Sequence, residues 1–291
     1  MKLVMTILVK NEADIIETNI RFHADQGVDA FLVMDNASDD ETPEILAELA
    51  KSYDLTVVHN PSSDYQQEQW MTGLAFQARR QLGADLVISN DADEFWATRD
   101  GASLKTQLTK SDSVVTVPRF NFVDSLETMK SGKPFQACNN KVVSPILYSR
   151  EDQLLRPGLA MPLVRISPKV IVNPWGLLKI KGGNHRARHL RFWAGRDNGN
   201  MEVHHYPIRN YLQFERNIRN RQRLLQRDPA TRMGVHYKRW VELYAQGKLE
   251  AEFDSMSLKE SEIDTLQRIG VISRQLSTPL QQWASKKGIV P

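Results

Sequence analysis

Cysteine is nearly absent from this chain of 291 residues, in which Cys138 is the single example. One cysteine excludes an internal disulfide and a zinc site built from several cysteines. Because structural disulfides are typical of oxidising compartments, this scarcity favours a cytoplasmic location.

Long apolar runs are missing as well. No stretch approaches the roughly 18 apolar residues that a membrane-spanning helix needs, so we expect none to cross a bilayer. The apolar segment LVMTILV at residues 3–9 is short, lacks a small-residue cleavage site and is followed by the polar sequence KNE. We interpret it as a buried strand rather than as a signal peptide.

A glycine-rich phosphate loop is the third absence. The segment LVKNEAD at residues 8–14 closes the first predicted strand and contains no glycine. Dinucleotide-binding folds and P-loop enzymes need glycine at this point, so the sequence argues against both. The same absence counts against a sugar-phosphate nucleotidyltransferase, which we retain as an alternative function.

The net charge of +3 conceals an uneven distribution. Residues 11–60 hold 12 acidic and two basic residues, whereas residues 179–239 hold 15 basic and four acidic residues. The basic half predicts an anionic partner, and an anionic membrane surface is one candidate. A non-enzymatic polyanion-binding protein is a second alternative. It leaves the acidic motif described below unexplained, and we expect no nucleic-acid partner.

Short apolar runs alternate with helical patterns over the first hundred residues. This alternation predicts an α/β fold with a doubly wound sheet, in which ligands bind at the carboxyl ends of the strands. The predicted strands are residues 3–9, 30–34, 55–59 and 85–89, and the predicted helices are residues 12–26, 43–52 and 66–82. Further on, we predict strands at 113–120 and 142–149, a hairpin or pair of edge strands at 162–174, a helix at 207–227 and two weaker helices in 240–291.

Three carboxylates fall within four residues in the segment VISNDADEFWA, residues 87–97. Asp91 and Asp93 follow a buried strand, and residues two apart in an extended segment face the same side. Uncompensated carboxylates repel, but Mg²⁺ or Mn²⁺ held together with substrate phosphate oxygens would resolve the repulsion. The alternative is the start of a helix, with Asn90 or Asp91 as its cap.

The second predicted strand also ends in polar residues. Asp35 and Asn36 come at its tip, where a carboxylate accepts hydrogen bonds from a nucleobase or ribose. The alternative for the segment DNASDDET is an Asx-type turn that leads into a capped helix, with Asp39 and Thr42 in the capping roles.

The segments ILVKNEADII, FLVMDNASDDET and LVISNDADEFW together resemble glycosyltransferase family 2, which has the GT-A fold. DADEFW is similar to a D-x-D-E-F subgroup that carries G-N-H and H-Y segments, present here as KGGNHRA and VHHYP. The resemblance implies a Rossmann-like central mixed sheet flanked by helices, with a C-terminal helical extension. We place the GT-A-like domain at 1–239, with a nucleotide-sugar-binding half (1–110) and an acceptor half (111–239), and the extension at 240–291.

The resemblance also implies the chemistry. A hexosyltransferase would move a sugar from a UDP or GDP type donor to a glycan, glycolipid or other saccharide acceptor, with inversion, at the inner face of the membrane. Mn²⁺ or Mg²⁺ would neutralise the diphosphate that leaves. The implied metal ligands are Asp91, Asp93 and a downstream histidine, His205 before His185. The donor would be bound by Thr6, Lys10, Asn11, Glu12, Asp35, Asn36, Asp91 and Arg209.

The catalytic base is left open by the sequence. Family 2 enzymes that invert use a carboxylate, usually in an E-D pair about a hundred residues after the D-x-D. This chain has only REDQ at residues 150–153. The candidates are therefore Asp124, Asp152 and Glu94.

Overall fold

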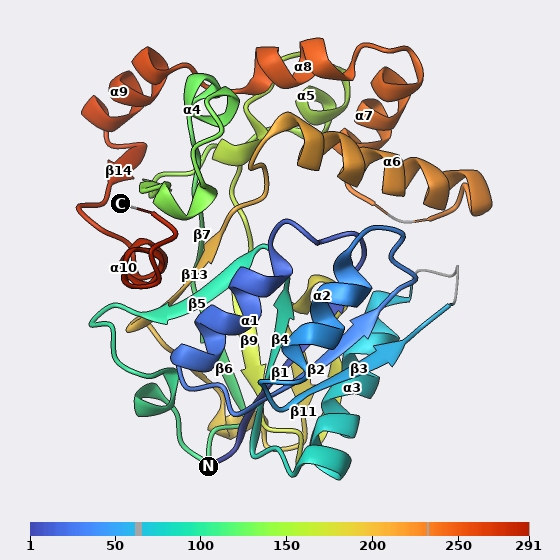
Figure 1. Ribbon diagram of the computed structural model, residues 1–291, viewed down its shortest axis with the longest axis vertical. Coiled ribbons are helices and arrows are strands. Elements are labelled where there is room, and N and C mark those ends of the chain that lie inside the picture. The colour runs from blue at the N-terminus through green and yellow to red at the C-terminus, as the bar shows by residue number, and fades with distance from the viewer. Residues whose placement is uncertain (62–65, 232, 291) are drawn as a thin grey trace. The chain divides into compact units, whose positions relative to one another are not determined.

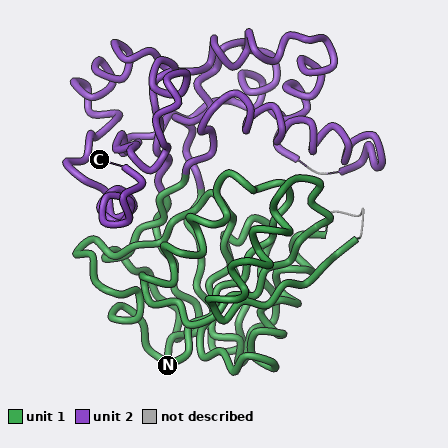
Figure 2. The backbone as a smooth tube through the Cα atoms, in the orientation of Figure 1, with its two compact units in different colours: residues 1–119, 167–205 green, residues 120–166, 206–291 purple. Residues whose placement is uncertain are grey.

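The computed structural model describes residues 1–61, 66–231 and 233–290. They form two compact units, which Figure 2 colours separately. Unit 1 contains residues 1–119 and 167–205, and unit 2 contains residues 120–166 and 206–291. The predicted boundary after residue 110 therefore falls inside unit 1, and the one after residue 239 falls inside unit 2.

A seven-stranded mixed sheet forms the centre of unit 1, in the order β12-β6-β9-β4-β1-β2-β3. Strands β4, β1, β2 and β3 are parallel neighbours, and β9 is antiparallel to both β4 and β6. All four strands predicted in the first hundred residues are confirmed. The bounds are β1 (Leu3–Val9), β2 (Ala30–Asp35), β3 (Leu55–His59), β4 (Leu86–Asp91), β6 (Val114–Val117), β9 (Lys169–Val172) and β12 (Arg196–Asp197).

Helices flank this sheet because β1, β2 and β4 are apolar on both faces and must be covered on both. Val4, Leu32 and Val87 pack against the apolar stripe of α3, and Figure 1 shows α1 and α2 in front of the strands. The bounds are α1 (Ile16–Asp25), α2 (Thr42–Leu49) and α3 (Gln67–Leu82), with a 3₁₀ helix, η1, at Leu104–Gln107.

Two smaller strand pairs complete unit 1. Strand β5 (Glu94–Thr98) pairs antiparallel with β13 (Met201–His205), and β10 (Leu177–Ile180) forms a hairpin with β11 (Ala187–His189). Short 3₁₀ helices follow β10 and β11, η4 at Gly182–Asn184 and η5 at Phe192–Ala194. Strand β7 (Arg119–Asn121) spans the break between the units.

Unit 2 is mainly helical. The predicted helix at 207–227 is present as α6, whose Phe214 and Ile218 pack with Trp240 and Phe253 in a core of its own. The helices are α4 (Leu126–Lys130), α5 (Arg150–Leu155), α6 (Tyr211–Arg227), α7 (Val235–Ala245), α8 (Leu249–Met256), α9 (Glu260–Arg268) and α10 (Pro279–Lys286). The remaining elements are β8 (Asn140–Val142), β14 (Ile272–Arg274), η2 (Phe135–Ala137) and η3 (Met161–Leu163). Over the described residues, no helix has the length and apolar character to cross a membrane.

Two local predictions were wrong, and a third was confirmed except for a break. The hairpin at 162–174 is the end of η3 followed by the single strand β9, and the strand at 142–149 shares only its first residue with β8, before Pro145. The strand at 113–120 is divided into β6 and β7 at Pro118. Proline has no N–H to donate to a sheet, which explains the break at Pro118.

Candidate functional site

The acidic motif forms a tight turn between two strands. Strand β4 ends at Asp91 and β5 begins at Glu94, so the alternative of a helix start is wrong. The turn sends the three carboxylates into three environments. Asp91 and Asp93 keep exposed side-chain fractions of 32% and 24%, whereas Glu94 has none.

Asp91 is held by a lysine that the sequence analysis missed. Lys169 is fully buried, and its Nζ lies 2.5 Å from Asp91 Oδ2 and 3.0 Å from Glu94 Oε1. It is the first residue of β9, and the antiparallel pairing of β9 with β4 brings it to the motif. A buried ammonium group requires such partners. The one available signal was a lysine at the start of the apolar run KVIV.

Glu94 belongs to the same buried network. Its Oε1 also accepts a hydrogen bond from Arg119 Nη1 at 2.5 Å. Charges therefore alternate from Asp91 through Lys169 and Glu94 to Arg119. Because Glu94 is enclosed and paired twice, an acceptor hydroxyl cannot reach it. The geometry argues against Glu94 as the catalytic base and for a structural role.

Asp93 is paired with a histidine. Its Oδ2 lies 3.4 Å from His205 Nε2, because β13 pairs with β5 in a register that sets His205 opposite Glu94. The neighbouring His204 is directed elsewhere, with its Nε2 3.3 Å from Glu202 Oε2. The expectation that strand alternation sends the two histidines to opposite faces agrees with these contacts.

The G-N-H segment contacts Asp91 from the loop between β10 and β11. Asn184 is buried at a φ of +58°, and its Nδ2 donates to Asp91 Oδ1 over 3.5 Å. Its Oδ1 and the Glu94 Oε2 are buried without a hydrogen-bond partner in the described parts of the chain. The loop and the turn therefore offer buried polar atoms beside the paired Asp91.

His185 is the second predicted histidine ligand. Its Nδ1 lies 2.9 Å from the Pro168 carbonyl oxygen, to which it donates when the ring is neutral. Burial, followed by the positive charge of Lys169, lowers the pKa of His185 to about 4. The ring is therefore neutral at pH 7. The same cation that lowers the pKa would also repel a metal ion.

A complete metal site of protein ligands is not found. Within the described ranges, no three side chains of His, Cys, Asp or Glu come together to hold a metal ion. Asp93 and His205 nevertheless offer one carboxylate oxygen and one imidazole nitrogen at the same point. A divalent ion there would take its other ligands from substrate phosphates and water, as is common for Mg²⁺. The pair fits this incomplete type of site.

The tips of β1 and β2 are tied together. Lys10 Nζ donates to the carbonyl oxygens of Asn36 and Ala37 at 2.9 and 2.8 Å. Asp35 Oδ1 accepts from the backbone N–H and the hydroxyl of Ser38. An Asx-type turn is present at Asp40, whose Oδ1 accepts from the backbone N–H of Thr42 two residues on. The predicted capping roles of Asp39 and Thr42 are wrong, because α2 begins with Thr42 inside the helix and has no side-chain cap. Asn11, at a φ of +58°, exchanges two hydrogen bonds with Asp39.

Two of the residues predicted to bind the donor, Thr6 and Arg209, have buried side chains. Thr6 is fully buried, with its hydroxyl facing Ile88 and Ser89 inside the sheet, so it cannot contact a bound nucleotide directly. Arg209 is a buried residue of unit 2 and donates to the Tyr206 carbonyl oxygen at 3.0 Å. Glu12 lies after β1, where its backbone N–H donates to Thr42.

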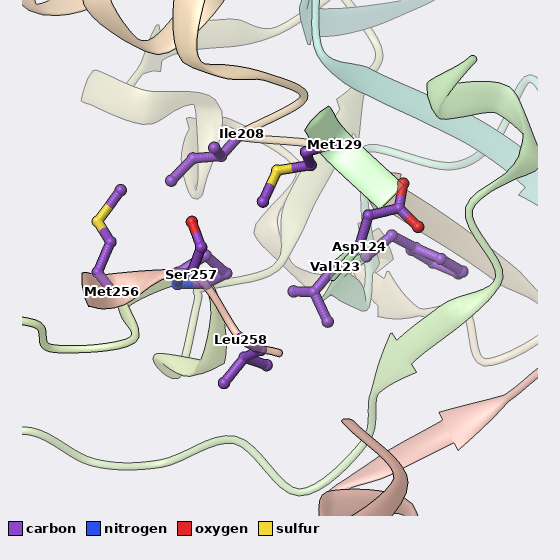
Figure 3. Close-up of a pocket in the computed structure, with 9 residues that line it drawn as sticks. Val123, Asp124, Met129, Ile208, Met256, Ser257 and Leu258 are labelled. Carbon is purple, nitrogen blue, oxygen red and sulfur yellow. The ribbon is translucent and has the colours of Figure 1, made fainter. Parts of the chain in front are cut away.

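The other two candidate bases lie in unit 2. Asp152 accepts from Ser149 and closes the capping box of α5. Asp124 is half-buried beside Cys138, and its loss of solvation there raises its pKa to about 6. It lines a small pocket, which is open to solvent, with Phe122, Val123, Met129, Pro162, Ile208, Met256, Ser257 and Leu258. In Figure 3 its carboxyl group points away from Met256 and Leu258.

The family model described as "Glycosyl transferase family 2" matches residues 6–162. The chain belongs to glycosyltransferase family 2. Its mixed sheet flanked by helices agrees with the GT-A type of fold expected from the sequence. The matched segment contains the acidic motif and ends before Lys169 and His205. The contacts of these two residues with the motif are therefore known only from the structure of this chain.

Among solved structures, the chain is similar to TarS from S. aureus, at 12% identity and a TM-score of 0.44 over 85% of this chain and 43% of that one. It therefore spans less than half the length of that TarS chain. It is also similar to TarS 1–349 in complex with UDP-GlcNAc, at 12% identity and a TM-score of 0.44 over 93% of this chain and 76% of that one. A third similar structure is glucosyl-3-phosphoglycerate synthase from Mycobacterium tuberculosis in complex with Mn²⁺, UDP and glucosyl-3-phosphoglycerate. The identity is 18% and the TM-score 0.38, over 80% of this chain and 82% of that one. No curated protein sequence matches the chain.

Proposed function

We propose that this chain is a metal-dependent glycosyltransferase that moves a hexosyl group from a UDP or GDP sugar to a glycan, glycolipid or other saccharide acceptor. The observation that carries the proposal is the pair formed by Asp93 and His205 at 3.4 Å, next to an Asp91 already neutralised by Lys169. The lysine removes the charge of one carboxylate. Asp93 and His205 then present one carboxylate and one imidazole next to each other, a pair that suits a divalent ion.

Asp93 and His205 would hold the ion, and the donor diphosphate would supply further oxygens. An imidazole in the ligand set favours Mn²⁺ over Mg²⁺, which is bound through oxygen. When bound, the ion neutralises the charge that develops on the leaving diphosphate. Asp91 is placed by Lys169 and Asn184, and we assign it to the ribose side of the donor rather than to the metal.

The nucleotide would lie over the tips of β1 and β2. Asp35, Asn36, Asn11 and Glu12 belong to these tips, and Lys10 holds the two together through the carbonyl oxygens after β2. This is the carboxyl edge of parallel strands, where α/β folds bind ligands. The backbone of the segment after Thr6 would line the base, while the Thr6 side chain stays within the sheet.

Inversion requires a base that accepts the proton of the acceptor hydroxyl. The hydroxyl oxygen then bonds to the anomeric carbon, and the bond from that carbon to the diphosphate oxygen breaks. Of the carboxylates in unit 2, Asp124 suits the task better, because a pKa of about 6 makes it a stronger proton acceptor than an ordinary aspartate while it stays ionised at pH 7.5. Asp152 is engaged in capping α5.

Calorimetric titration of UDP and GDP sugars, with and without Mn²⁺, tests the proposal. We expect one class of donor to bind only in the presence of the ion. Asp93→Asn should then weaken binding at least ten-fold while the far-UV spectrum and the melting temperature without ligand stay unchanged. Metal-independent binding, or an Asp93→Asn variant that binds as tightly as wild type, would contradict the assignment.

We also propose a cytoplasmic location with peripheral contact at the inner face of the membrane. The support is the basic segment 179–239, of which Arg232 lies outside the described residues. Clustered cations are attracted to anionic lipid, and an enzyme acting on a glycolipid would gain from the contact.

A further inference from the structure

The hairpin of β10 and β11 has one face on the core of unit 1. Leu177 and Ile180 are buried and belong to the core cluster that contains Met71 and Val87 of α3 and β4. Leu177 and His189 form a cross-strand pair, and both residues are buried. The register of the hairpin shifts between Leu177 and Lys179, and the residues that follow Leu177 and His189 in the chain are exposed instead of packed on the core.

The exposed side of the hairpin and the residues after it carry large apolar side chains next to basic ones. Leu178 and Leu190, each one residue beyond the buried pair, are 53% and 62% exposed. Phe192 and Trp193 follow in η5 and are 78% and 72% exposed, with ring centroids 5.3 Å apart in an edge-to-face contact. Single exposed apolar residues are common, but four within 16 residues of chain mark a surface that is covered in use. We name these four residues the hairpin surface.

Basic residues are interspersed with the hairpin surface along the chain. Residues 175–196 contain six Lys and Arg and no Asp or Glu. Two of the six are paired, Lys179 with Glu68 and Arg196 with Asp112. The others make no ion pair or side-chain hydrogen bond with any residue that the structure describes, and they are Lys181, Arg186, Arg188 and Arg191.

We propose that the hairpin surface docks on an anionic phospholipid bilayer. Leu178, Leu190, Phe192 and Trp193 enter the boundary between headgroups and acyl chains, and the four unpaired cations bind the lipid phosphates. Tryptophan is enriched at this depth because its ring is amphipathic, and long basic side chains reach from an apolar surface to the headgroups. This proposal specifies the surface for the peripheral contact suggested above.

The charge distribution argues against the other occupants. A second copy of the chain on the same surface would form a symmetric contact, which brings the unpaired cations of both copies together with no acidic residue in the segment to offset them. A neutral glycan would cover the aromatic rings and leave the cations without partners. An anionic bilayer satisfies both features at once.

Docking would bring the donor site to the lipid. The turn of the same hairpin carries Asn184, which contacts Asp91, and His185, which contacts the residue before Lys169. Only Lys179 and Ile180 separate Leu178 from the start of this turn. A donor bound at Asp91 and Asp93 would thus lie beside the structural element that we place on the membrane.

Sedimentation with sucrose-loaded vesicles tests the proposal. Vesicles of phosphatidylcholine with about 30% phosphatidylglycerol should bind the wild-type chain at least ten-fold more tightly than vesicles of phosphatidylcholine alone, and 0.5 M salt should weaken the binding. The double variant Phe192→Ser, Trp193→Ser should reduce partitioning at least ten-fold, and Arg188→Ser, Arg191→Ser should remove the preference for anionic lipid. Leu276→Ser is the matched control, because Leu276 is an exposed apolar residue outside the hairpin, and it should bind like wild type.

Three results would overturn the proposal. They are equal binding to both kinds of vesicle, an unaltered Phe192→Ser, Trp193→Ser variant, or a wild-type dimer in light scattering that this variant converts to a monomer. Donor binding is measured separately on the same variants in the absence of vesicles. If it is retained while vesicle binding is absent, the docking surface is wrong and the proposed transferase function is unaffected.

Discussion

Lys169 holds its ammonium nitrogen 2.5 Å from a carboxylate oxygen of Asp91, with no part of the lysine side chain exposed. The contact joins the first residue of β9 to the last residue of β4. This contact changes the role that we assign to the acidic motif. The three carboxylates are not a common cradle for a metal, because two of them share a buried protein cation and only Asp93 faces His205.

Replacing this lysine should be costly. Lys169→Met leaves both Asp91 and the fully buried Glu94 without this cation. Breaking a buried pair such as Lys169 and Glu94 costs roughly 3–5 kcal/mol of unfolding free energy. Urea titration followed by tryptophan fluorescence measures the loss. Adding Asp91→Asn to this variant should recover part of it, because one of the two carboxylates is then gone.

Lys179→Met is the control for this prediction. Lys179 is also a strand lysine with a carboxylate partner, Glu68, but that pair is exposed to solvent. Solvent screens such a pair, so this variant should unfold at nearly the wild-type urea concentration. If the two lysine variants lose equal stability, the network around Lys169 has no special importance.

The two adjacent histidines provide a test of the metal ligand. His205→Ala should raise the Mn²⁺ concentration needed for half-maximal donor binding by ten-fold or more, because it removes one of two protein ligands. His204→Ala changes the same residue type one position away, where the ring contacts Glu202 instead. It should leave the Mn²⁺ requirement unchanged. Equal effects of both substitutions would show that neither ring is a specific ligand.

Gly183 tests the loop that contacts Asp91. It has a φ of +74°, and an added Cβ would come within 2.6 Å of the His185 ring. Gly183→Ala should therefore cost about 1–2 kcal/mol in backbone conformation alone. It should also weaken donor binding, because His185 and Asn184 must shift. Gly182→Ala adds the same methyl group where no described atom lies within 4 Å, and both quantities should stay close to wild type. A Gly183→Ala variant that matches Gly182→Ala would contradict this account.

Much of unit 1 could be predicted because its signals are local. Apolar runs of branched residues produced β1 to β4, and alternation along β13 placed His204 and His205 on different faces. The role of Lys169 could not be found this way. A lysine at the start of an apolar strand ordinarily points to solvent, and only the antiparallel pairing of β9 with β4 brings it against Asp91.

The turn at the acidic motif escaped prediction for a similar reason. An acidic residue after an apolar strand is as typical of a helix start as of a turn. The outcome depends on β5, which forms because β13, which begins 107 residues after β5 begins, supplies its partner, from Glu94 opposite His205 to Thr98 opposite Met201. Pairing over such a distance in the sequence leaves no local pattern.

Asp124 makes the stability of the chain depend on pH. Its pKa rises from 3.8 to about 6 on folding, so the folded state binds more protons than the unfolded state between these values. The contribution of this group to stability is therefore greatest below about pH 4 and is lost as the pH rises through 6. The loss approaches roughly 3 kcal/mol if the full shift is realised.

Asp124→Asn stays neutral, so its unfolding free energy relative to wild type should increase steadily from pH 4 to pH 7, as measured by urea titration at each pH. The same variant should be inactive at every pH, whereas wild-type kcat/KM should fall only below about pH 6. A stability difference that does not vary with pH would show that the carboxyl group is not desolvated as described, and an active variant would remove Asp124 as the base.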